Sequence, residues 1–215
     1  MTSDASALPG WIVLGRQGDR VAAAVLDPDG AEVDRVTLTG SALAHWVADM
    51  EATASPRWVW NDAPRWYPQL LAAGVRLARC HDLRLVHAIL RRSQLVTDSG
   101  ALRTAAGWDA GPFVAATVKA PALFELDATG APDGPPDSLD AALGEWTRQR
   151  DAVATSRDPA RLRLLVAAES AGALIAEELR AVGLPWDAQA HGRILTETLG
   201  ECPPGGGQPS LLAAA

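Results

Sequence analysis

The sequence predicts an α/β domain, because apolar runs of strand length alternate with runs of helix length and Gly or Pro separates them. Residues 57–93 show this most clearly, as strand, helix, strand and helix in turn. Pro64 is placed to open the first of these helices and Gly74 to end it. A chain of 215 residues suits one domain of about 150 residues with a helical segment beyond it.

The N-terminal part is expected to open with a meander of three strands. A tight turn joins the last two of them at residues 27–30, where Asp-Pro-Asp-Gly combines a fixed φ angle with a glycine. A helix follows, since apolar side chains recur there at helical spacing. The expected elements are strands 11–14, 21–26 and 33–38, helix 42–52, strand 58–60, helix 64–73, strand 75–80 and helix 82–92.

The C-terminal part is expected to be helical. Residues 94–137 lose periodicity and are rich in Gly and Pro, which predicts a long, partly disordered loop. Helices should follow from 137 or 138 to about 155, from Asp158 to Gly183, and from Asp187 to about 199. We therefore expect an α/β domain in residues 1–156, with its flexible loop at about 94–137, and a helical extension in residues 157–215.

The charge of the chain limits the partners that it can bind. A net charge of −7 argues against strong, independent binding of nucleic acid, which depends on neutralising phosphates. Residues 57–103 are an exception, with eight arginines against three acids. A weak DNA contact is therefore expected at Arg65, Arg84, Arg91 and Arg92. The alternative is that these arginines are spread over solvent-exposed helix faces and bind no partner.

The absence of certain sequence features predicts the location of the protein and the state of its cysteines. It contains neither a twenty-residue apolar run nor an N-terminal signal, so we expect a cytoplasmic protein that does not associate with membranes. Cys80 and Cys202 lie far apart and outside any metal-binding spacing, which argues against a zinc site or a disulfide framework.

Two stretches carry a resemblance to a known family. WVWNDAPRWYPQLLAAGVRLARCHDLRLVHAILRRS and LLVAAESAGALIAEELRAVGLPW are similar to the N-terminal region of actinobacterial family A DNA polymerases, labelled bifunctional 3′–5′ exonuclease/DNA polymerase. The similarity covers about residues 57–93 and 158–200. It implies a ribonuclease H-like, exonuclease-like domain with a mixed sheet. The expected order of strands and helices is the order found in such domains. The similarity further implies that the helical extension leads toward a polymerase domain, so the chain is expected to be a truncated form.

The resemblance also says which residues exonuclease chemistry would need. Such enzymes hold two divalent cations about 4 Å apart with several carboxylates, which come from the first strand, a later helix and a third element. Here the first strand has no acid, and Arg65 and Trp66 stand near the second position. Trp146 and Arg150 occupy the spacing that should hold Tyr and Asp. The sequence therefore predicts no catalytic set and no metal site.

Asp62 and Asp82 are the only weak candidates for a catalytic role. Each stands where a helix is expected to begin, so each is also expected to cap that helix with its carboxylate. Other catalytic motifs are missing, since neither a phosphate-binding glycine loop nor a Gly-x-Ser-x-Gly turn occurs.

Three functions remain open. The first is a degenerate exonuclease-like domain that acts in DNA replication or repair as a scaffold for a polymerase domain, or as a weak DNA guide, and needs no cofactor. The second is an active 3′–5′ exonuclease with displaced carboxylates, which would need a divalent metal. The third is a protein-interaction module that uses the 94–137 loop. Whether the chain is an enzyme thus depends on where its carboxylates lie.

Overall fold

The computed structural model describes residues 8–98, 102, 135–183, 187–201, 203 and 208–213. They fall into two compact units, Met1–Ala181 and Val182–Ala215. Most of the expected 94–137 loop lies outside the described residues, as does Cys202.

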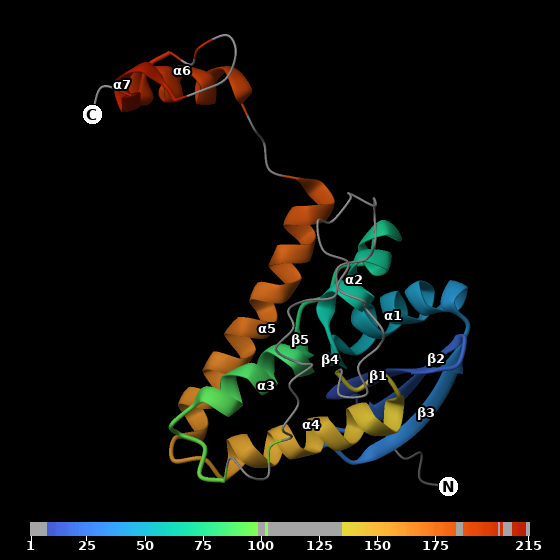
Figure 1. Ribbon diagram of the computed structural model, residues 1–215. Helices are drawn as coiled ribbons and strands as arrows, with labels where there is room; N and C mark the ends of the chain where they lie inside the picture. Colours follow the sequence, from blue (N-terminus) through green and yellow to red (C-terminus); the bar gives the residue numbers. More distant parts are fainter. Residues whose placement is uncertain are drawn as a thin grey trace, which may run out of the picture. The chain divides into compact units, whose positions relative to one another are not determined.

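A five-stranded mixed sheet forms the centre of the first unit, with strand order β3-β2-β1-β4-β5 (Figure 1). The first three strands form the expected antiparallel meander, and β4 and β5 run parallel to β1. The strands are β1 Trp11–Gln17, β2 Arg20–Leu26, β3 Glu32–Leu38, β4 Arg57–Trp60 and β5 Cys80–Asp82. The predicted α/β class is confirmed.

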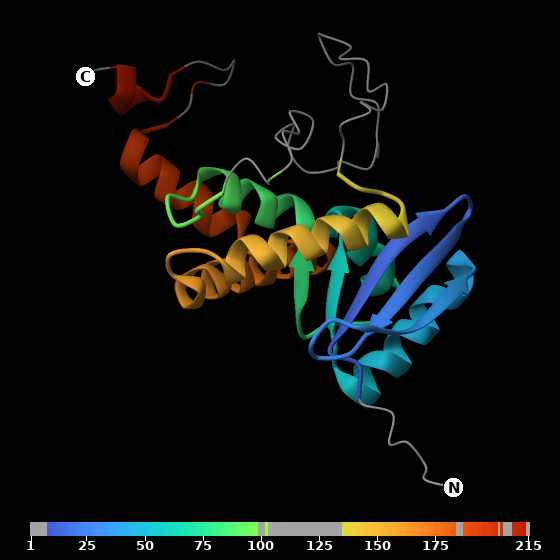
Figure 2. The same ribbon diagram turned by 90° about the horizontal axis from the view of Figure 1, so that it is seen from below.

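Helices cover both faces of this sheet (Figures 1 and 2). On one face, α1 (Gly40–Ala54) and α2 (Ala63–Ala72) pack on a core that includes Trp58, Trp60 and Trp66, all buried. On the other face lie α3 (Leu83–Arg92) and α4 (Leu139–Ala154). These indole rings are buried and contribute to core packing.

The strand expected over residues 75–80 is wrong in position, because β5 begins only at Cys80. The preceding residues find hydrogen-bond partners outside the sheet. Val75 N donates to Leu70 O, Leu77 N to the Tyr67 hydroxyl at 3.2 Å, and Ala78 N to Glu51 Oε1 at 2.7 Å. Because helix ends and side chains satisfy these amides, this stretch crosses from α2 to the sheet without joining a ladder.

The long helix α5 (Pro159–Val182) lies beside β5, the last strand of the sheet. Its Ser170 is buried, and its hydroxyl accepts a hydrogen bond from Asp82 N at 3.2 Å. The Cys80 thiol donates to Ser170 O at 3.1 Å. Ser170 therefore attaches α5 to β5, and the helix covers this edge of the sheet.

The second unit contains α6 (Ala188–Leu199) and the single turn α7 (Ser210–Ala213). The helix α6 begins next to Asp187, as predicted, and Asp187 caps it, since its carboxylate accepts from Gln189 N and Ala190 N. Among the helices that the structure describes, none is both long and apolar enough to cross a membrane.

Candidate functional site

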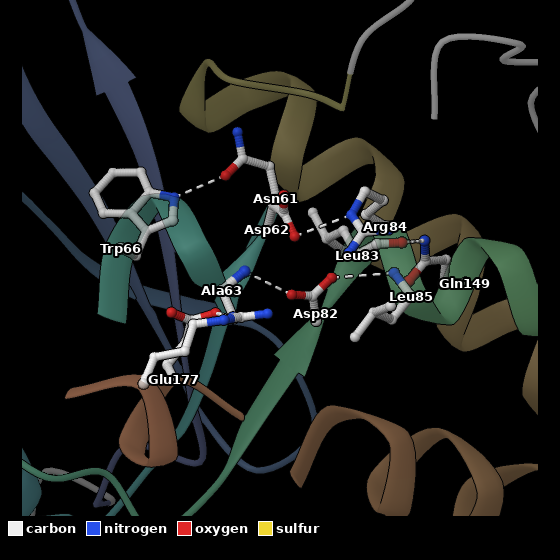
Figure 3. Close-up of polar contacts among 11 residues, drawn as sticks. Asn61, Asp62, Ala63, Trp66, Asp82, Leu83, Arg84, Leu85, Gln149 and Glu177 are labelled. Carbon is white, nitrogen blue, oxygen red and sulfur yellow. Dashed lines mark hydrogen bonds and ion pairs between the residues drawn. The ribbon is translucent and has the colours of Figure 1, made fainter. Parts of the chain in front are cut away.

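The polar residues singled out in the sequence meet at the carboxyl ends of β4 and β5. Asn61 and Asp62 follow β4, and Asp82 is the last residue of β5. Because β4 and β5 are parallel, these ends lie at one edge of the sheet, where open α/β sheets bind ligands. Figure 3 shows Asp82 between the first turns of two helices, with Arg84 turned toward Asp62.

Asp82 is fully buried and holds the N-termini of two helices together. Its Oδ2 accepts from Ala63 N of α2 at 2.6 Å, and its Oδ1 accepts from Leu85 N of α3 at 3.0 Å. Burial and the nearby charge of Asp62 raise the pKa of Asp82 to about 7, against the two amide donors and Arg84. The expected capping of α3 is confirmed, and the carboxyl group also holds α2 in place.

Asp62 does not cap α2, so that expectation is wrong. It occupies the N-cap position, but its side chain makes no capping hydrogen bond. The second helical residue, Pro64, has no N–H, and the third, Arg65, donates its N–H to Asp62 O instead. Asp62 Oδ1 instead accepts from Arg84 Nε at 2.9 Å, with the two side chains 2% and 12% exposed. Arg84 is thus paired with an acid and offers a ligand little net charge.

A cavity of about 340 Å³ beside this pair gathers four acidic residues. They are Asp62, Asp82, Glu169 and Glu177. Two arginines also line the cavity, and each has an acidic partner: Arg84 binds Asp62, and Arg180 binds Glu177. Within the described ranges, no group of three or more His, Cys, Asp or Glu side chains is arranged to hold a metal ion.

A second set of residues lies at the carboxyl ends of β1 and β4, and we call it the Arg16–Arg65 cluster. It consists of Arg16, Asn61, Arg65 and Asp137. Asp137 Oδ1 accepts from Asn61 Nδ2 at 3.0 Å and Arg65 Nη1 at 3.2 Å, and Arg16 Nε lies 4.0 Å away. The side chains of Arg16 and Arg65 are 43% and 33% exposed. Two guanidinium groups thus share one carboxylate and face solvent.

Asp137 reaches this cluster because the chain passes unusually close to β1. A Cβ atom on Gly15 would lie 2.2 Å from Leu139 N, so only glycine allows the approach. Arg16 N donates to Asp137 O, and Ser138 then caps α4 by accepting from Ala141 N. The sequence analysis did not identify Arg16 or Asp137 as site residues. Gly15, a glycine within β1, was the one signal in the sequence that another part of the chain lies close to this strand.

The other predicted DNA contacts lie elsewhere. Arg91 and Arg92 are exposed in the last turn of α3, where basic side chains favour the helix dipole. Arg91 lies seven positions after Arg84 in α3, which is about 10 Å along the helix axis. The four predicted arginines therefore occupy three places: the cluster, the Asp62 pair and the end of α3.

A buried polar network connects α3, α4 and β5. His81 Nε2 bonds Gln149 Oε1 at 2.9 Å, and Gln149 Nε2 donates to Glu145 Oε1 at 2.9 Å. Burial alone would raise the pKa of Glu145, but the nearby His87 ring, whose Nδ1 lies 3.6 Å from Glu145 Oε1, and hydrogen bonds from Arg148 and Gln149 outweigh it and lower this pKa to about 2. His81 and His87 thus both face this network.

Comparison with known proteins adds no relative to this picture: no protein-family model, curated protein or solved structure matches the chain.

Proposed function

We propose that this chain is a degenerate, ribonuclease H-like exonuclease domain of the family A DNA polymerase type, which guides DNA weakly or supports a polymerase domain. The order of its elements supports this assignment, since a three-strand meander is followed by two parallel strands connected through helices. The two stretches that resemble the polymerases form β4 to α3 and α5, which pack together around Asp82 and Ser170.

The Arg16–Arg65 cluster carries the proposal. A two-metal exonuclease needs carboxylates at the end of its first strand. Here Arg16 is the second-last residue of β1, and Arg65 lies near it, with Asp137 close to both. Guanidinium groups repel divalent cations but bind phosphate through paired N–H donors. The position at which an active exonuclease would hold its metal ions is therefore, in this chain, suited to a phosphate of the DNA backbone instead.

The test exploits opposite charges within one cluster. Binding of a fluorescein-labelled single-stranded oligonucleotide is measured by anisotropy at low salt. We expect Arg65→Gln to weaken binding about threefold and Asp137→Asn to strengthen it by a similar factor, because local potential sets the affinity for phosphate. Arg193→Gln, exposed on α6, is the control.

Opposite shifts would not arise if both residues merely supported the fold, since both variants would then bind less. If the wild-type chain does not bind DNA at low salt, the guide role is wrong and only the scaffold role is left.

A second candidate function is an active nuclease with displaced carboxylates, favoured by the four acids around the 340 Å³ cavity. It would need Arg84 and Arg180 to leave their partners so that Asp62, Asp82 and Glu177 could face a divalent ion. This function predicts digestion of single-stranded DNA with manganese or magnesium that Asp62→Asn abolishes. If neither metal supports digestion by the wild-type chain, this candidate is excluded.

A further inference from the structure

A different pocket lies at the opposite ends of the same strands. It is a cavity of about 350 Å³ lined by Trp11 and Arg57, which begin β1 and β4, together with His81, and by residues of α4 and α5. Trp11 and Arg57 are register partners in the sheet. The lining contributed by the two helices is Gln149, Arg150, Val153, Ala154, Arg163, Val166 and Ala167. We call this the Trp11 pocket.

Among the described residues, no acid pairs with the positively charged side chains of the Trp11 pocket. Arg57, Arg150 and Arg163 line it, no acid does, and within the described part of the chain none of the three forms an ion pair. Arg57 Nη1 donates to Cys80 O at 3.2 Å and Arg150 Nη2 to Asp29 O at 2.9 Å. Burial and the nearby Arg79 lower the pKa of Arg57. A half-buried cation without a counter-ion is unfavourable.

The arginines are held in place by the tryptophan. The guanidinium carbons of Arg57 and Arg150 lie 5.6 and 5.7 Å from the centre of the Trp11 ring. The ring itself packs edge-on against Trp146 at 5.3 Å. This stacking fixes the direction of the donors before a ligand arrives, which reduces the entropy lost on binding.

His81 adds no charge to the pocket. Burial lowers the pKa of His81 to about 4, so the ring is neutral at pH 7. Gln149 Nε2 donates to Leu83 O and to Glu145, so Gln149 Oε1 must accept from the His81 Nε2 proton. The arginines are therefore the source of attraction for an anion.

We propose that the Trp11 pocket binds a small phosphate ester. Three guanidinium groups match the charge and the several acceptor oxygens of a phosphate dianion better than those of a single carboxylate. Val153, Ala154 and Val166 offer an apolar wall to the organic part of the ligand. The cavity volume is at the lower end of small-molecule sites, which suits a compact ester. This inference does not depend on the DNA-guide function.

Isothermal titration of the full chain tests it with three probes: inorganic phosphate, a deoxynucleoside 5′-monophosphate and the corresponding uncharged deoxynucleoside. We expect the two phosphates to bind and the nucleoside not to bind. Arg163→Gln should weaken monophosphate binding about tenfold, the effect of losing one charged hydrogen bond. Arg163 is exposed and makes no ion pair that supports the fold, so this variant should fold normally.

Two matched controls make the result decisive. Arg161→Gln removes the same charge two residues away on α5, outside the pocket, and Arg65→Gln removes it at the DNA-guide cluster. Both should bind the monophosphate like the wild type. The inference is overturned if the wild-type chain does not bind the monophosphate at millimolar concentration, or if either control weakens binding as much as Arg163→Gln.

Discussion

Asp82 shows how one buried side chain can fix a site and make it pH-dependent. Its two oxygens accept from the first turns of α2 and α3, so the relative position of these helices depends on one carboxyl group. Nearby, Asp62 forms an ion pair with Arg84. Two acids at one sheet edge thus have different partners: Asp82 accepts from backbone amides, and Asp62 accepts from a guanidinium group.

We predict that Asp82→Asn lowers the free energy of unfolding by about 2 kcal/mol, because the amide nitrogen of Asn would face one of two buried N–H donors. The pH dependence should change as well. The pKa of Asp82 is about 7 in the folded state, above the ordinary aspartate value of 3.8, so the folded state binds more protons than the unfolded state between these pH values. Wild-type stability should therefore fall as pH rises from about 4 to 7.

Urea denaturation across this pH range measures both effects. The Asn variant should lack this decrease, while Asp151→Asn, an exposed change on α4, should retain it. The interpretation fails if wild type and Asp82→Asn have parallel pH profiles.

Glu145 gives the opposite pH dependence. Its folded-state pKa of about 2 lies below the ordinary glutamate value of 4.5, so its contribution to stability is present above pH 4.5 and is lost as pH falls toward 2. Glu145→Gln should cost about 3 kcal/mol at pH 7, since it removes the buried anion that faces the buried His87 and Gln149 and pairs with Arg148. In this variant the free energy of unfolding should also decrease less than in the wild type as pH falls from about 4.5 toward 2. Glu197→Gln, exposed on α6, should change neither.

At the scale of elements, two glycines should respond in opposite ways to alanine. A Cβ on Gly15 of β1 would lie under 3 Å from the backbone of residues 138 and 139, whereas a Cβ on Gly172 of α5 would meet nothing within 4 Å. Gly15→Ala should destabilise the fold by about 3 kcal/mol or more, as overpacking against rigid backbone does. Gly172→Ala should stabilise it by up to about 1 kcal/mol.

Thermal melts of the two glycine variants compare these effects directly. Equal shifts would mean that α4 does not approach β1 as closely as the structure shows.

Local pattern predicted most of these elements because their causes are local. The meander and the starts of α4 after Ser138 and α6 after Asp187 follow from turn and capping residues and from apolar spacing. β5 was misplaced because the amides of residues 75, 77 and 78 find partners on Leu70, Tyr67 and Glu51, which no periodicity reveals. The site could be predicted only in part for the same reason. Asp137 reaches Arg65 across 72 residues of sequence, and Glu177 joins Asp62 through helix packing.

At the scale of the whole molecule, charge is distributed unevenly along an acidic chain. The net charge of −7 repels DNA at long range, so any binding must come from a small local group of cations. In the Arg16–Arg65 cluster two arginines surround one acid. Such a group would hold a DNA strand only weakly, which is consistent with the guide role that we propose.

The salt dependence of DNA binding should report how many phosphates this cluster neutralises. If Arg16 and Arg65 each neutralise one phosphate, the logarithm of the association constant should fall with the logarithm of salt concentration with a slope of about −1.4 for single strands. Arg65→Gln should reduce the slope to about −0.7, whereas Arg91→Gln should leave it unchanged because Arg91 lies at the far end of α3. A slope of about −3 or steeper would require more cations than the cluster contains, and a reduction by Arg91→Gln as large as that by Arg65→Gln would move the contact to the end of α3.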